Sequence, residues 1–174
     1  MEMFPLVCHP DTPAGAVESI TVHTERTGQR LWLRYHVECE LNALVLPGPA
    51  APARCEGLWQ STCFEAFLRD ASYAEFNFAP SSQWAAYRFD GYRENMTVLD
   101  LAADPEIGLD ASEGHFALEV TIPLVGLGQK LGLSAVIEET DGTKSYWALA
   151  HPPGKPDFHA PACFAATLAP PEQS

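Results

Sequence analysis

Residues 58–93 hold the side chains of this sequence that are best suited to chemistry. Trp59 and Glu65 lie in LWQSTCFEAFLR, and Trp84, Arg88 and Tyr92 lie in the following QWAAYRFDGYR. Indole and phenol rings can stack on the C–H faces of a sugar, while a fixed carboxylate and guanidinium can accept and donate hydrogen bonds. These residue types therefore predict a binding site for a small ligand with apolar faces and polar edges.

The sequence around Glu65 indicates that this carboxylate is buried. If residues 58–69 form a strand, apolar side chains fall on both of its faces, as in a central strand of a sheet. A buried carboxylate needs hydrogen-bond donors, and Arg88 is the partner that we expect. The pair could tie two strands together as an ion pair, or it could bind a ligand.

The charge of the chain narrows the choice of ligand. Its 174 residues include 23 acidic and 10 basic side chains, which give a net charge of −13. Such a chain repels nucleic acid and anionic membrane surfaces, so a neutral or cationic ligand fits better. The N-terminus has no basic and apolar export signal, and no apolar run is long enough to cross a membrane, so we expect a cytoplasmic protein.

Alternating apolar residues predict that most of the chain is β-strand. RLWLRYHVECEL, HFALEVTI and KLGLSAVIE alternate most strictly, and Asp-Gly in TDGT and FDGY predicts two hairpins. Weaker strands are expected in VESITVHT, LWQSTCFEAFLR, YAEFNF, QWAAYRF and CFAATL. About nine or ten short strands predict an all-β, antiparallel two-sheet sandwich of the jelly-roll type, with a closed barrel as the alternative.

By the usual size of a domain, the chain reads as one domain over residues 1–174. Residues 42–57 predict a crossing loop, residues after Pro123 a single helical turn, and the tail APPEQS a frayed end. The five cysteines are scattered and contain no C-x-x-C pair, so we expect free thiols rather than disulfides or a zinc site.

Four segments together resemble a known family. GLWQSTCFEAFL, YAEFNFAPSSQWAAYRFDGY, FALEVTIPL and YWALAHPPGKPDFH are similar to bacterial DOMON-like proteins related to family 9 carbohydrate-binding modules. The resemblance covers about residues 16–168, which it implies as the core of the domain. It implies a β-sandwich that binds a sugar or a haem and has no catalytic activity. It also implies sugar-binding roles for Trp59 and Glu65, for Arg88 on a following strand, and for Trp147 as a second ring.

The haem-binding relatives offer an alternative ligand. Their axial ligands are a methionine with a histidine or a lysine, which Met96 with His151 or Lys155 could supply. Met96 could equally fill space in the core.

The loop HPPGKPDFHAPAC, residues 151–163, contains residue types that bind metals. These are His151, Asp157, His159 and Cys163. Their spacing matches no standard zinc pattern, so we expect no metal there. We expect instead that this proline-stiffened loop shapes a binding pocket, with His151 at its mouth.

An enzyme is the remaining class. Glu65 and Glu75 could act as acid and base on a glycoside. Glu75, however, alternates with Phe76 and Phe78 as an exposed strand residue would. The sequence therefore predicts a non-catalytic domain that binds a small neutral ligand, a saccharide or a cell-wall fragment, through aromatic rings and an Arg/Glu pair.

Overall fold

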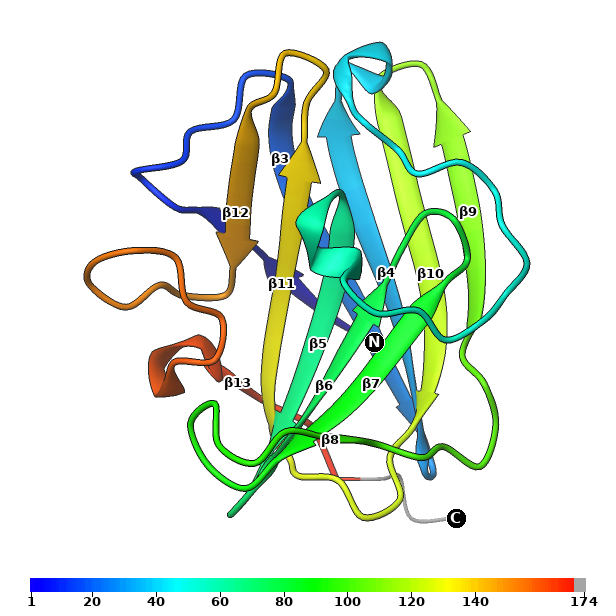
Figure 1. Cartoon of the computed structure of the whole chain (residues 1–174), viewed down its shortest axis with the longest axis vertical. Coiled ribbons are helices and arrows are strands. Elements are labelled where there is room, and N and C mark those ends of the chain that lie inside the picture. Colours follow the sequence, from blue (N-terminus) through cyan, green and yellow to red (C-terminus); the bar gives the residue numbers. More distant parts are fainter. Residues whose placement is uncertain (171–174) are drawn as a thin grey trace.

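The computed structural model describes residues 1–170, which form two antiparallel sheets packed face to face (Figure 1). The five-stranded sheet has the order β1 (Glu2–Pro5), β3 (Val17–Thr27), β4 (Arg30–Cys39), β10 (His115–Pro123), β9 (Glu106–Ser112). The eight-stranded sheet has the order β2 (Val7–Cys8), β12 (Lys144–Ala148), β11 (Lys130–Glu138), β5 (Cys63–Arg69), β6 (Tyr73–Phe78), β7 (Trp84–Phe89), β8 (Thr97–Val98), with β13 (Ala166–Thr167) also paired to β11. Three 3₁₀ turns complete the elements: η1 (Leu41–Ala43), η2 (Leu58–Gln60), η3 (Pro161–Cys163).

The predicted all-β sandwich is confirmed, with thirteen strands within residues 1–170 in place of nine or ten. Among the additional strands, β2 and β8 have two residues each and are too short to show an alternating pattern, whereas β9 has seven residues but is exposed along nearly all of its length, so no apolar row marks it. Both Asp-Gly hairpins are present, because β12 pairs antiparallel with β11 and β8 with β7. The tail residues 171–174 of the predicted frayed end lie outside the described residues.

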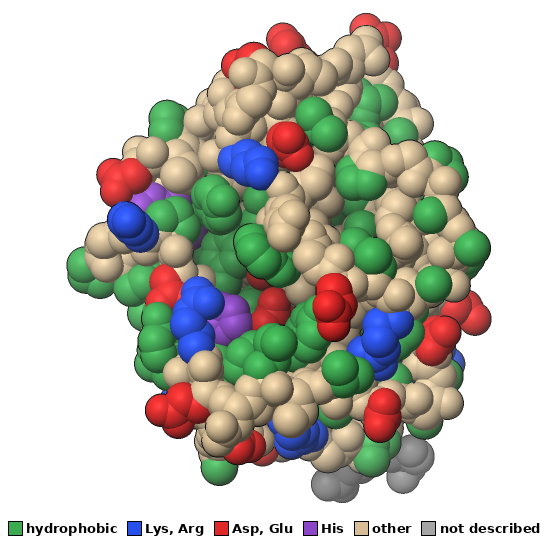
Figure 2. Space-filling model, in the orientation of Figure 1, with side chains coloured by type: hydrophobic (Ala, Val, Ile, Leu, Met, Phe, Trp, Pro, Cys, Tyr) green, Lys and Arg blue, Asp and Glu red, His purple; other side chains and the backbone are tan. Residues whose placement is uncertain are grey.

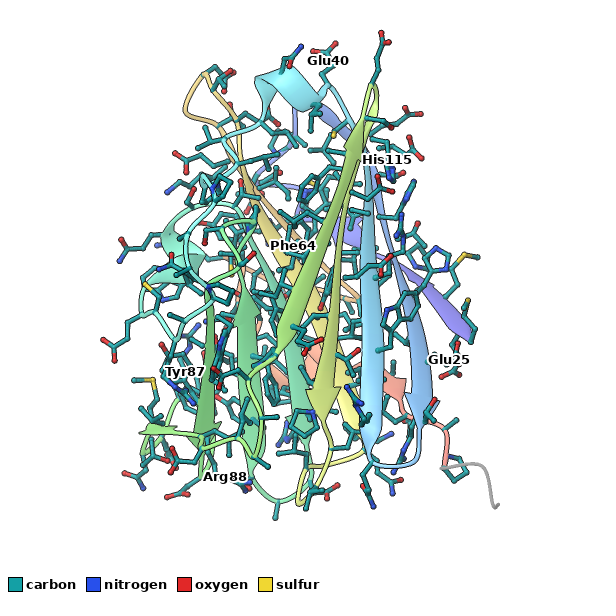
Figure 3. All side chains as sticks on the ribbon, turned by 90° about the vertical axis from the view of Figure 1, so that its right-hand side faces the viewer. Glu25, Glu40, Phe64, Tyr87, Arg88 and His115 are labelled. Carbon is teal, nitrogen blue, oxygen red and sulfur yellow. The ribbon has the colours of Figure 1, made fainter. Side chains whose placement is uncertain are left out.

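Strict alternation along β4 produces the inner face of the five-stranded sheet. Leu31, Leu33, Tyr35 and Val37 are buried, whereas the residues between them are partly exposed. They face the inner row of the other sheet, where Phe64 lies between the two layers (Figure 3). This interface between the sheets is the main hydrophobic core.

Strands β5, β6 and β7 are buried on both faces, which accounts for the density of aromatic residues in this part of the sequence. Their inward side chains join the main core, and Phe76 and Phe78 lie there with stacked rings. Their outward side chains, including Phe67, Tyr73 and Phe89, form a second cluster beneath Phe158 and Phe164. The chain after β12, residues 149–165, therefore supplies a cover for the outer face of the sheet.

Two predicted elements differ in the structure. Residues 58–60 form the 3₁₀ turn η2, not the start of a strand, and β5 begins only at Cys63. The helical turn predicted after Pro123 is also wrong, because the Leu124 N–H donates to the carbonyl of Gln29 (2.8 Å) and the chain then makes a turn without helix.

None of the helices in residues 1–170 has the length and apolar composition needed to cross a membrane.

Candidate ligand-binding site

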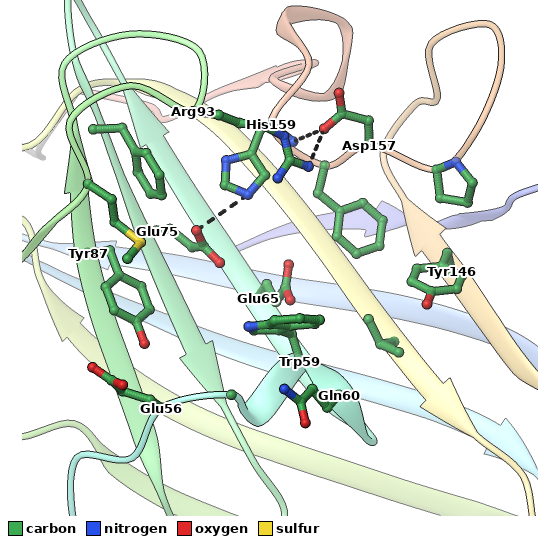
Figure 4. A pocket seen from close by; sticks show the side chains of 16 residues that line it. Glu56, Trp59, Gln60, Glu65, Glu75, Tyr87, Arg93, Tyr146, Asp157 and His159 are labelled. Atoms are coloured by element: carbon green, nitrogen blue, oxygen red, sulfur yellow. Dashed lines mark hydrogen bonds and ion pairs between the residues drawn. The ribbon is translucent and has the colours of Figure 1, made fainter.

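A cavity of about 820 Å³ opens on the outer face of the eight-stranded sheet (Figure 4). Its floor is formed by outward side chains of β5, β6 and β11, and its walls by η2, β7, β12 and two loops. Figure 2 shows the hollow in this face, with green hydrophobic side chains around red acidic and purple histidine side chains. Its lining includes the aromatic residues Trp59, Tyr87 and Tyr146 and the polar residues Glu65, Glu75, Arg93, Asp157 and His159.

Glu65 and Glu75 lie on neighbouring strands of the floor. Glu65 pairs across the ladder with Asn77, two residues beyond Glu75 on the same face of β6. Only 3% of Glu65 and 6% of Glu75 is exposed. Glu65 is buried as the sequence predicts, but the expectation that Glu75 is an exposed strand residue is wrong, because the loops after β12 and β7 cover this face.

Burial raises the pKa of both carboxyl groups. The pKa of Glu75 rises to about 7, with the neighbouring Asn77 amide opposing this shift in part. The pKa of Glu65 rises well above its ordinary range through burial and the nearby charge of Glu75. Ser134 Oγ donates a hydrogen bond to Glu65 Oε2 (3.1 Å). At neutral pH the two carboxyl groups together can both donate and accept hydrogen bonds.

His159 lies next to Glu75, with 3.5 Å between Nε2 and Oε2. The Arg93 backbone N–H donates to the Tyr73 hydroxyl (3.1 Å), whose own hydrogen is then free to point at His159 Nδ1 (2.7 Å). In the tautomer in which the Tyr73 hydroxyl donates to Nδ1, the proton of the neutral ring lies on Nε2 and faces Glu75. Burial lowers the pKa of His159 to about 4, which keeps the ring neutral at physiological pH.

Arg93 and Asp157 close the rim of the cavity. Arg93 Nη2 donates to Asp157 Oδ1 (2.9 Å), and the Tyr92 hydroxyl donates to Asp157 Oδ2. Burial by itself would raise the pKa of Asp157, but these hydrogen bonds and the Arg93 charge outweigh it and lower the pKa. The His159 backbone N–H also donates to Asp157 (3.2 Å). Asp157 therefore ties the loop after β7 to the loop after β12.

Trp59 forms part of the cavity wall and remains 53% exposed. It is carried by η2, which begins after Gly57 in a left-handed conformation (φ 73°) that favours glycine. The structure therefore places Trp59 and Glu65, two of the predicted site residues, in one cavity (Figure 4). Tyr92 lines an adjoining hollow of about 610 Å³, which shares Arg93 and Asp157 with the first.

The predicted pair of Glu65 with Arg88 is not formed. Arg88 stands opposite Ala74 in an inward row of the sheet, whereas Glu65 belongs to an outward row. The Arg88 guanidinium instead donates to Ser72 Oγ (3.3 Å) and to the carbonyl of Gly126 (3.4 Å). The pairing prediction is therefore wrong, because the two side chains leave the sheet on opposite faces.

Trp84, Trp147 and His151 also lie outside the cavity. The two tryptophans belong to the core between the sheets and are 2% and 6% exposed. His151 donates through Nε2 to the carbonyl of Val7 (2.7 Å), at the edge formed by β2. Met96 lines the cavity, but His151 and Lys155, the axial partners considered for haem, are not among its lining residues.

Each of the four possible metal ligands in residues 151–163 makes a hydrogen bond to another group of the protein. Cys163 Sγ donates to the carbonyl of Asp157 (3.1 Å), and burial raises the pKa of this thiol to about 11. Within residues 1–170, one group has ligand atoms close enough together for a metal, on the outer face of the five-stranded sheet. It consists of His36, Glu38 and His115, whose ligand atoms lie within 4.8 Å of one another.

Sequence reasoning missed several lining residues: Arg93, Tyr146 and the roles of Glu75 and His159. For Glu75 a signal was present, since YAEFNF is apolar on both faces, as is the segment around Glu65. His159 and Arg93 carry no such signal, because they lie on loops whose position depends on the tertiary structure.

Comparisons with known proteins support the fold. No family model matches the chain, and no curated protein matches it in sequence. The structure is similar to the crystal structure of a candidate carbohydrate-binding protein from Bacteroides uniformis, with a TM-score of 0.62 and 18% sequence identity. The match covers 93% of this chain and 83% of that protein. At this identity the similarity shows a shared β-sandwich fold.

Proposed function

We propose that this chain is a non-catalytic domain that binds a saccharide in the cavity above β5 and β6. The observation that carries the proposal is an exposed Trp59 ring beside a floor of buried polar groups, Glu65 and Glu75. The ring offers a flat surface for the C–H face of a sugar, and the two carboxyl groups can bond its hydroxyls. The volume of about 820 Å³ lies in the range of small-molecule sites.

The similarity to the Bacteroides uniformis protein supports a carbohydrate-binding role without naming a ligand. The rim adds a second support, because Asp157 fixes both loops that shape the cavity before any ligand binds. A preformed site loses less conformational entropy on binding than a flexible one.

Isothermal titration calorimetry after a glycan-array screen tests this proposal. We expect Trp59→Ala to weaken binding of the best glycan at least tenfold. Trp32→Ala is the matched control, since Trp32 is a partly exposed tryptophan on the outer face of the five-stranded sheet. Wild-type protein that binds no glycan, or a Trp32 variant that loses binding as Trp59→Ala does, would contradict the proposal.

Glycoside cleavage is a second candidate, favoured by the presence of two buried carboxyl groups in one cavity. Its geometry is less suitable. Glu65 and Glu75 are diagonal neighbours on one floor, whereas hydrolysis needs carboxyl groups on two sides of the scissile bond. Release of 4-nitrophenol from a panel of aryl glycosides, abolished by Glu75→Gln, would replace the binding proposal with this one.

A further inference from the structure

Building on the proposed function, we propose that the cavity selects saccharides that carry a protonated amine, such as amino sugars with a free amino group. Acidic side chains outnumber basic ones around the cavity. Apart from two tyrosines, its ionisable lining residues are Glu56, Glu65, Glu75, Asp157, Arg93 and His159. Four are acids and one, Arg93, is a permanent cation, because His159 is neutral.

The single cation of the lining is already paired with another acid. Arg93 donates to Asp157 at the rim (2.9 Å), which leaves the floor without a bonded cation. The polar groups of the described residues that act on Glu65 and Glu75 at short range are the neutral Ser134 hydroxyl, His159 ring and Asn77 amide, while the Arg93 charge acts on both acids from the rim. Two buried acids with neutral partners form a site that a ligand cation would complete, because opposite charges stabilise each other strongly where water is excluded.

An orphaned polar side chain on the same face points to a ligand or its bound water. Asn77 lies across the ladder from Glu65 and projects from the face of β6 that carries Glu75. It is 1% exposed, and although its amide lies near enough to Glu75 to oppose the rise of that pKa, neither its amide oxygen nor its amide nitrogen makes a hydrogen bond of normal geometry in residues 1–170. Buried polar groups are nearly always satisfied in native proteins, so a missing partner requires an explanation.

The chemistry of an ammonium group matches this floor. An ammonium has three donors and no acceptor, and the oxygens of the two carboxyl groups and of the Asn77 amide provide acceptors on adjacent strands. The rings of Trp59, Tyr87 and Tyr146 add a surface that attracts cations through their π-electron faces. A neutral sugar could hydrogen-bond to the carboxyl groups of the floor through its hydroxyls, but it would bring no positive charge to stabilise their ionised forms.

Binding of an ammonium should release protons. Glu75 is half protonated near neutral pH, and a cation beside it favours the ionised form. The groups that face Glu75 are Glu65 from β5, Tyr87 from β7, Tyr73 from its own strand, and Arg93 and His159 from the loops. Affinity for an amino sugar should therefore increase from pH 5.5 to 7.5, until the amine itself loses its proton.

The test uses the full chain and β-1,4-linked trisaccharides that differ only at C2. Chitosan triose carries a free amine, chitin triose an acetamide and cellotriose a hydroxyl. An array with further matched amine, acetamide and hydroxyl sets covers other ring stereochemistries. We expect the amine member of the recognised set to bind at least tenfold more tightly than the other two. Titrations in two buffers of different ionisation enthalpy should show proton release at pH 7.

Substitution of the floor distinguishes a charge effect from a packing effect. Glu75→Gln and Glu65→Gln keep the shape of the side chain, and each should reduce the amine-to-hydroxyl affinity ratio at least tenfold. Glu18→Gln, at an exposed site on β3, is the control that should keep the wild-type ratio. Melting temperatures measured on the same samples verify that the variants are folded.

The possible outcomes separate the two proposals. Equal binding of the three members of a matched set, with ratios unchanged by Glu75→Gln, overturns the preference for an amine and leaves saccharide binding intact. Binding of putrescine as tightly as the best amino sugar overturns the sugar part. Failure of every glycan to bind overturns the proposed function itself.

Discussion

Replacing Phe76 and Trp59 by alanine distinguishes a core ring from a ring that lines a cavity. Phe76 is completely buried, and its neighbours across the ladder are Ala66 and Ala86, which are too small to fill the space that the ring leaves. Loss of such a ring costs about 3 to 5 kcal/mol of unfolding free energy. For a domain of this size, 1 kcal/mol corresponds to about 2 to 4 °C in melting temperature.

We therefore expect Phe76→Ala to lower the melting temperature by about 6 to 20 °C. Trp59 is 53% exposed on the short η2, so its truncation removes much less packing. We expect a cost of about 1 kcal/mol and a shift of about 4 °C or less for Trp59→Ala.

Scanning calorimetry measures both shifts under the same conditions, and glycan binding is measured in parallel. Trp32→Ala controls for the general effect of removing a partly exposed indole, and it should keep glycan binding. If Trp59→Ala lowers the melting temperature as much as Phe76→Ala does, Trp59 is a core residue and the reasoning that makes it a cavity wall is wrong.

Three other variants test the carboxyl floor, one close contact and the rim. Glu75 has a folded pKa of about 7 against an ordinary value of 4.5, so wild type should lose about 3 kcal/mol as pH rises through this window. Glu75→Gln lacks this loss, so the difference in melting temperature between this variant and wild type should rise in favour of the variant from pH 5 to pH 8. The control Glu18→Gln should differ from wild type by the same amount at every pH. The same constant difference in Glu75→Gln would contradict the raised pKa of Glu75. In Gly128→Ala the new Cβ would overlap the backbone of the β5–β6 turn, which should lower the unfolding free energy measured by urea titration by about 1 to 3 kcal/mol. In the control Gly48→Ala the new Cβ meets nothing within 4 Å, so this variant should be as stable as wild type. Asp157→Ala removes the acceptor that joins the two rim loops, so amide hydrogen exchange in residues 151–160 should become faster; unchanged exchange would show that the loops are held by other contacts.

The sandwich could be predicted because its signal is local. Inward and outward side chains alternate along a strand, so the burial of Leu31, Leu33 and Tyr35 follows from their spacing alone. The apolar residues on both faces of CFEAFLR likewise indicate a central strand, and hence the burial of Glu65. Strands of two residues, such as β8, give no alternation and could not be found in this way.

The membership of the site depended on tertiary structure. Register decides which side chains share a face, and it places Glu65 and Glu75 in outward rows and Arg88 in an inward row. A shift of one residue reverses the face of a side chain, so a partner on a neighbouring strand cannot be assigned from residue type alone. Trp84 illustrates the same point, because its amphipathic ring suits a binding site but its row faces the core.

The sequence by itself determined the strands, the sandwich and a buried carboxylate on a central strand, since these follow from the alternation of residues a few positions apart. Only the tertiary structure decided that Glu75 is covered and that His159, 84 residues later in the chain, lies 3.5 Å from it. The physical reason is that loops contact the sheet through side chains distant in sequence, and no local pattern encodes where a loop returns. The cavity forms because the loop after β12 folds over the part of the outer sheet face that carries Glu65 and Glu75, while the rest of that face is hydrophobic.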